Sequence, residues 1–146
     1  MEYFVGISLA LAVSLFATFV GFDRDRSFYP VVMVVIAFLY DLFAVMGGSA
    51  HALYLEVAAS FAFVLVAVIG FKTNLWLVVA ALAGHGVFDF IHPLLITNDG
   101  VPGWWPMFCL TYDVAAAAYL AWLLSRSVLA AKPVSGSSRP AGGEKP

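Results

Sequence analysis

Five runs of apolar residues follow one another along this sequence, and each is long enough to cross a bilayer. A helix of about 20 residues rises about 30 Å, which is the thickness of the hydrocarbon core. Lipid offers no hydrogen-bond partners to backbone amides and carbonyls, so each run is expected to be helical. We therefore predict an all-α integral membrane protein with five transmembrane helices in one compact bundle. The approximate limits of the helices are residues 3–22, 29–46, 52–71, 75–93 and 106–125.

The composition supports this prediction, since 63% of the 146 residues are hydrophobic and 11% are charged. The mean hydropathy of +0.96 also departs from that of soluble domains. Residues 1–126 hold all five spans, and their bundle is expected to contact the lipid bilayer directly. Residues 127–146 are rich in Pro, Gly and Ser, which predicts a disordered cytoplasmic tail. A net charge of −2 without a basic cluster argues against a nucleic-acid partner.

Positively charged residues occur on only one side of the predicted bundle. Arg24 and Arg26 lie between spans one and two, Lys72 lies between spans three and four, and the remaining basic residues follow span five. The opposite side holds the N-terminus and two connections that contain no Lys or Arg. Lys and Arg are retained on the cytoplasmic side during insertion. We therefore predict an inner-membrane protein with its N-terminus outside and its C-terminus in the cytoplasm.

Ionisable residues within the spans are predicted to lie at similar depths. Counted from the outer ends of the spans, four carboxylic acids lie about 6 to 10 Å below the outer boundary. One histidine lies about one turn deeper, and another lies nearer the surface. These side chains are Asp41, Glu56, Asp89, Asp113, His85 and His92. Because ionisable groups are costly inside a membrane, we expect them to converge on a site in the outer half of the bilayer.

Three of these residues share one face of the fourth span. His85, Asp89 and His92 fall within about 60° of one another on a helix of about 3.6 residues per turn. The glycines on either side of His85 would let a neighbouring helix approach closely. Pro93 disfavours helical geometry at the preceding His92, so the helix is expected to end or kink there.

Imidazoles and carboxylates together are typical ligands of Zn²⁺ and similar divalent metals. We predict that His85, Asp89 and Asp113 form the centre of such a site and carry its chemistry. His92, Glu56 and Asp41 are expected to be further ligands, or to orient the central residues from behind. A metal in this position would activate water, which suggests that the protein binds or hydrolyses a lipid-like substrate.

The same side chains are also compatible with purely structural roles. Asp41 or Asp113 alone could make a hydrogen bond between helices that serves assembly. Glu56 lies one turn from Ser60, whose hydroxyl could serve as its hydrogen-bond partner. His51 lies at the predicted start of a helix, near the membrane interface, where a histidine needs no functional explanation. The structural interpretation is weaker for the whole set, because packing requires one polar pair rather than six costly groups.

Two other functions remain open from the sequence. Without a metal, carboxylates and histidines in a bundle are the components of a proton relay or a proton-coupled carrier. The chain could instead be a non-catalytic accessory or assembly subunit of a membrane complex. The small-residue stretch 115–122 would suit a homo-oligomer or a partner helix, although such stretches also serve internal packing.

The longest predicted connection, "TNDGVPGWWP", joins the span that carries Asp89 to the span that carries Asp113. Its Gly and Pro residues predict irregular structure. Trp104 and Trp105 are expected at the level of the lipid head groups, where Trp is enriched. This segment either belongs to an aromatic belt or forms a lid over the polar site.

Overall fold

The computed structural model describes residues 1–126, which contain helices and no strand. The helices are α1 (Glu2–Val20), the 3-10 turn η1 (Phe22–Arg24), α2 (Phe28–Ala37), α3 (Leu39–Met46), α4 (Ala50–Lys72), α5 (Trp76–Leu95) and α6 (Trp105–Ser125). Taken together, α2 and α3 make one span, so the described chain has five segments that are long and apolar enough to cross a membrane. This confirms the predicted all-α membrane bundle. The predicted tail, residues 127–146, lies outside the described residues.

The second span differs from its predicted form, and the helix of the fourth span does not end at His92. The second span is interrupted at Phe38, between α2 and α3. Beside this break, the Ser60 hydroxyl of α4 lies 2.8 Å from the Ala37 carbonyl oxygen, which gives that carbonyl a partner. In the fourth span, α5 continues through Pro93 to Leu95. A proline costs one backbone hydrogen bond, but it does not end this helix.

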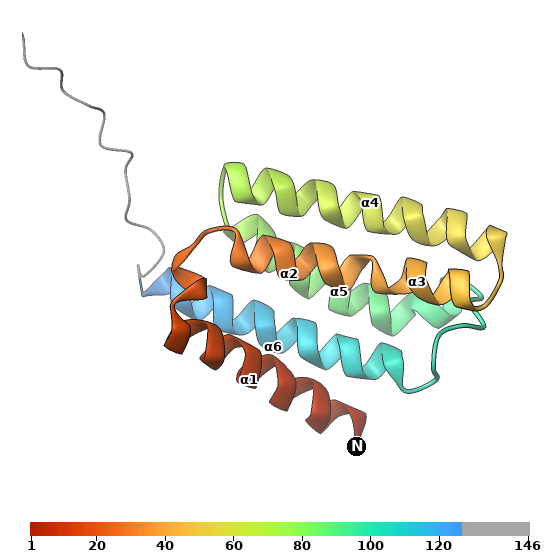
Figure 1. Cartoon of the computed structure of the whole chain (residues 1–146), viewed down its shortest axis with the longest axis horizontal. Helices are drawn as coiled ribbons and strands as arrows, with labels where there is room; N and C mark the ends of the chain where they lie inside the picture. The colour runs from red at the N-terminus through yellow and green to blue at the C-terminus, as the bar shows by residue number, and fades with distance from the viewer. Residues whose placement is uncertain (127–146) are drawn as a thin grey trace, which may run out of the picture.

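The central pair of the bundle is α5 and α6, which pack side by side along their lengths. On one side of this pair, α1 packs against α6. On the other side, α4 packs against α2, α3 and α5. Figure 1 shows the resulting order, with α4 and α1 at opposite edges and α2 and α3 lying over α5. Residues of α5 and α6 can therefore meet residues of α3 and α4 in the interior, although the two pairs of helices are far apart in the chain.

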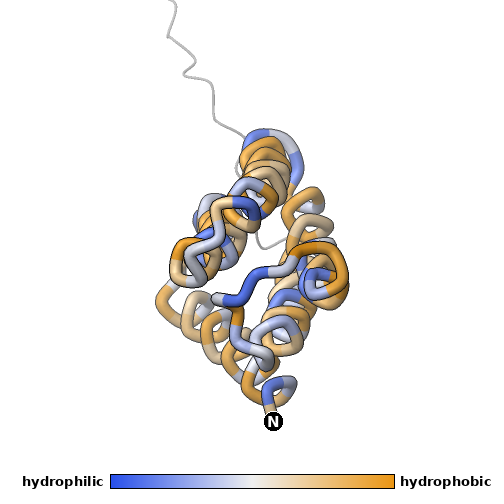
Figure 2. The backbone as a smooth tube through the Cα atoms, turned by 90° about the vertical axis from the view of Figure 1, so that its right-hand side faces the viewer, coloured by the Kyte–Doolittle hydropathy of each residue, from blue (hydrophilic) through white to orange (hydrophobic). Residues whose placement is uncertain are grey.

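Hydrophobic residues predominate along the helices, as Figure 2 shows. Large apolar side chains are exposed on several helices, including Phe4 and Phe19 on α1, Phe61 on α4 and Leu94 on α5. Exposure of this extent is unfavourable in water. The bundle therefore contacts the lipid bilayer through these faces.

The two ends of the bundle differ in charge. The N-terminus, the α3–α4 connection and the α5–α6 connection lie at one end, and the other connections lie at the opposite end (Figure 1). All the basic residues of the described chain lie at this second end: Arg24, Arg26, Lys72 and Arg126. The charge asymmetry noted in the sequence is therefore an asymmetry between the two ends of the folded bundle.

Gly6 allows the close contact between α1 and α6. A Cβ atom added at Gly6 would overlap the Thr111 hydroxyl and the Phe108 carbonyl of α6. The carbonyl belongs to the backbone and cannot rotate away. Gly84 on α5 is different, because a Cβ atom added there would meet only a ring carbon of Phe63 at 3.9 Å.

We predict that Gly6→Ala destabilises the bundle by about 1–3 kcal/mol, the usual cost of forcing extra volume into a packed contact. Gly84→Ala is the matched control, because the same methyl group has room there. Thermal unfolding in detergent micelles should show a lower Tm for Gly6→Ala and no decrease for Gly84→Ala. Equal Tm values for both variants would contradict the α1–α6 packing described above.

Candidate metal centre

A histidine and two aspartates meet in the interior, between α5 and α6. His85 and Asp89 lie one turn apart on α5, and Asp113 faces them from α6. His85 Nδ1 lies 2.7 Å from Asp113 Oδ2 and 3.3 Å from Asp89 Oδ2. One ligand atom from each residue lies within 4.8 Å of the other two. All three side chains are buried, so this group could hold a metal ion.

Several carboxylate oxygens of this group have no hydrogen-bond partner among the described residues. They are both oxygens of Asp89 and Oδ1 of Asp113. A buried polar group without a partner costs free energy, and a buried charge costs much more. A cation, a proton or a water molecule in contact with these oxygens would remove that cost. The group therefore offers free acceptors on two helices beside one imidazole.

The backbone of α5 comes close to α6 because residue 86 is glycine. A Cβ atom added at Gly86 would lie 3.1 Å from the Leu110 carbonyl oxygen and 3.3 Å from Asp113 Cβ. Both separations are tight, so a larger residue would push the helices apart beside the His85–Asp113 contact. Of the two glycines that flank His85, Gly86 makes the expected close approach, and Gly84 does not.

Glu56 and His92 form a second polar cluster, separate from the first group. His92 Nε2 lies 2.7 Å from Glu56 Oε1, and the Asn98 amide donates to the same oxygen at 2.9 Å. The Asn98 amide also lies 3.3 Å from the Tyr40 carbonyl oxygen. Next to this cluster, His92 and Asn98 line a cavity of about 310 Å³ beneath the α5–α6 connection. Figure 2 looks onto this end of the bundle, which carries several hydrophilic segments.

The Tyr40 side chain lies between the two histidines. Its ring centroid is 4.2 Å from that of His92 and 6.2 Å from that of His85. The Tyr40 hydroxyl is buried and has no hydrogen-bond partner among the described side chains. An aromatic ring therefore separates the two polar clusters, while its unpaired hydroxyl offers a hydrogen bond inside the bundle.

The remaining predicted residues lie outside both clusters. The Asp41 carboxylate is within 3.0 Å of the Ser60 hydroxyl and is partly exposed. His51 is exposed in the first turn of α4. The structure thus brings together His85, Asp89 and Asp113, whereas Glu56 pairs with His92. A metal-binding role for Glu56, His92 or Asp41 remains a prediction.

Sequence reasoning overlooked several residues that contribute to these clusters. Asn98 belongs to the connection that was predicted to be irregular, yet it is buried and bonded to Glu56. Tyr40 belongs to the second predicted span and was given no role, yet its ring lies close to those of both histidines. Nothing in the sequence marks either residue, because each obtains its partners from helices distant along the chain.

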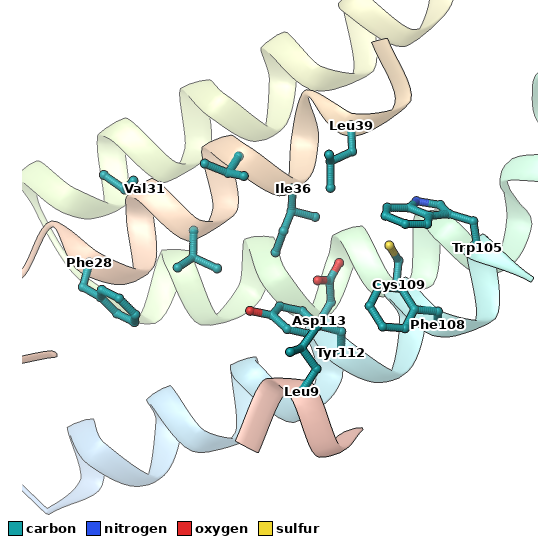
Figure 3. A pocket seen from close by; sticks show the side chains of 12 residues that line it. Leu9, Phe28, Val31, Ile36, Leu39, Trp105, Phe108, Cys109, Tyr112 and Asp113 are labelled. Carbon is teal, nitrogen blue, oxygen red and sulfur yellow. The ribbon is translucent and has the colours of Figure 1, made fainter. Parts of the chain in front are cut away.

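Asp113 also lies at the side of an apolar groove of about 360 Å³. The groove is bordered by α1, by α2 and α3, and by α6. Figure 3 shows the Asp113 carboxylate among apolar side chains that include Ile36 and Cys109. The candidate metal centre therefore adjoins a space lined almost entirely by hydrocarbon.

The sequence matches no family model, and comparisons with curated proteins and with solved structures find no similar chain.

We predict energetic coupling between Glu56 and His92, because the buried His92 Nε2 would lose its partner without Glu56. In a double-mutant cycle, Glu56→Gln and His92→Gln should show an interaction energy of about 0.5–3 kcal/mol. Glu56→Gln combined with His85→Gln is the control cycle, and these two changes should be additive. Free energies of unfolding would be measured by denaturant titration in micelles. Stronger coupling in the control cycle would mean that the two clusters act as one.

Proposed function

We propose that His85, Asp89 and Asp113 bind a divalent metal ion, with zinc as the first candidate, and that the site binds or hydrolyses a lipid-like substrate. The observation that carries this proposal is the set of buried carboxylate oxygens without partners beside an imidazole. A cation would let both carboxylates remain charged and the imidazole remain neutral at low cost.

The donor set suits zinc in number and type. Catalytic zinc sites commonly use three protein ligands from nitrogen and oxygen and keep a fourth position open. His85, Asp89 and Asp113 supply one nitrogen and two carboxylates. A bound divalent cation polarises an ester or phosphoryl oxygen and activates water for attack.

The surroundings of the site favour a lipid-like substrate. The group lies inside a bundle whose outer faces contact lipid, and Asp113 adjoins an apolar groove. The residues of the chain would then have distinct tasks. Asp89 and Asp113 would hold negative charge against the cation, while His85, whose Nδ1 lies 2.7 Å from Asp113 Oδ2, would supply the nitrogen ligand.

We expect near-stoichiometric metal in protein purified gently without chelators, and much less metal in Asp89→Asn. This substitution keeps the side-chain shape but removes the charge that a metal requires. Asp99→Asn is the matched control, because Asp99 is exposed in the α5–α6 connection and outside the group. Elemental analysis per mole of folded protein gives the measurement.

Three outcomes separate the possibilities. Low metal in Asp89→Asn with normal metal in Asp99→Asn supports the proposed centre. Equal loss in both variants would mean that the metal binds elsewhere or that folding is impaired, which a thermal unfolding curve distinguishes. A folded but metal-free wild type would reject the metal proposal.

A proton relay is the second candidate, and one observation favours it. In space, Glu56, His92 and Tyr40 lie one after another between the cavity at the bundle end and His85. Carboxylates, imidazoles and phenols are usual components of such relays. A relay would not need a metal, so the metal measurement also separates the two candidates.

A non-catalytic accessory subunit, or a homo-oligomer formed through the small-residue stretch 115–122, remains a prediction from sequence.

We further propose that the protein lies in the inner membrane with the basic end of the bundle in the cytoplasm. The support is the position of every described Lys and Arg at that end. A reporter that is active only in the periplasm should be silent when fused after Pro146 and active when fused before Met1. The reverse pattern would place the polar clusters in the cytoplasmic half of the bilayer.

A further inference from the structure

The apolar groove beside Asp113 opens sideways toward lipid. It lies between α1 and α2, and α1 packs on α6 rather than on α2. The residues that border it include Leu9 on α1 and Val31 and Val35 on α2, which are all exposed. In a bilayer, these positions meet the hydrocarbon chains of neighbouring lipids. The groove is therefore accessible from the membrane without passing through water.

The part of the groove that the second span lines is about as long as one leaflet of a bilayer is thick. Its lining on the second span extends from Phe28 to Leu39. At about 1.5 Å per residue, this stretch covers about 16 Å. Half of a hydrocarbon core of about 30 Å is about 15 Å. A hydrocarbon chain from a single leaflet matches this length.

Two buried polar atoms interrupt the apolar lining. The indole Nε1 of Trp105 and the Oδ1 of Asp113 both lack hydrogen-bond partners among the described residues. Figure 3 shows Trp105 at one end of the groove near Leu39 and Cys109, and Asp113 farther along. An indole N–H only donates, so it requires an acceptor. A pure hydrocarbon has none, but an amphiphile with an ester, carboxyl or phosphate oxygen does.

We propose that the groove binds one hydrocarbon chain of a membrane lipid, with an acceptor oxygen of the lipid bonded to Trp105 Nε1. The part of the lipid nearest its head group then lies at Trp105, and the hydrocarbon chain runs from there along α2 and past Asp113. This inference deepens the proposed function by naming the substrate class. The binding of a chain in the groove does not itself require a metal.

The test uses the full chain in phosphatidylcholine vesicles that contain a phosphatidylcholine with a diazirine on one chain. Irradiation converts the diazirine into a carbene, which inserts into adjacent side chains. Ile36 and Cys109 line the groove but are 7% and 4% exposed, so lipids surrounding the bundle do not reach them. Mass spectrometry of peptides should detect lipid adducts at these two residues. Adducts at exposed positions such as Phe61, with none at Ile36 or Cys109, would overturn the proposal.

A pair of α1 variants tests whether the groove itself is responsible. Leu9→Trp fills the groove, whereas Leu15→Trp places the same ring on an exposed part of α1 that does not line it. Adducts at Cys109 should fall several-fold in Leu9→Trp and stay unchanged in Leu15→Trp. An unchanged yield in Leu9→Trp would overturn the proposal.

A pair of tryptophan variants tests the predicted polar contact. Trp105→Phe keeps the ring but removes the N–H, and Trp104→Phe makes the same change at an exposed neighbour that does not line the groove. Adducts at Ile36 should decrease in Trp105→Phe only. Equal yields in the two variants would overturn the contact with Trp105. Metal content measured on the same samples separates this inference from the proposed metal centre: normal metal without groove adducts rejects the lipid site alone.

Discussion

Lipid cannot form hydrogen bonds, and this constraint governs the arrangement of the whole bundle. Every span must be helical, and the polar side chains within it need partners on their own helix or on another one. The chain meets this requirement through buried contacts such as His92 with Glu56 and Ser60 with the Ala37 carbonyl. The oxygens of Asp89 are the main exception, because they lie in the interior without a hydrogen bond. An exception of this kind is costly for a protein, and function is the usual reason for it.

The position of the unpaired Asp89 oxygens depends on how the neighbouring helices α5 and α6 pack. Gly86 brings the backbone of α5 close to α6, and Asp113 then faces His85 across the contact. A larger residue at position 86 would increase the separation of the two helices and weaken the approach of a nitrogen and two carboxylates to a common point. Helix packing and the candidate chemistry thus depend on the same contact.

The two polar clusters have different surroundings, which argues for different roles. Glu56, His92 and Asn98 bond to one another through Glu56 Oε1, leave Glu56 Oε2 unpaired, and adjoin a cavity at the end of the bundle. The group of His85, Asp89 and Asp113 has three unpaired carboxylate oxygens, and its Asp113 adjoins the apolar groove. The first cluster resembles a bonded structural or proton-transfer element. The second is a buried His/Asp/Asp group that could hold a metal ion.

The fold class and most span limits follow from the sequence alone, because length and hydropathy largely determine which segments can cross a bilayer. The presence of His85 and Asp89 on one helix face also follows from sequence, since residues four apart share a face. The sequence alone could not predict that Glu56 pairs with His92 or that Asp41 lies outside both clusters. These outcomes depend on the rotation of each helix against its neighbours. Tertiary packing alone decided the break at Phe38, the burial of Asn98 and the groove between α1 and α2. Each of these arises from contacts between segments far apart in the chain, which hydrophobic patterning does not specify.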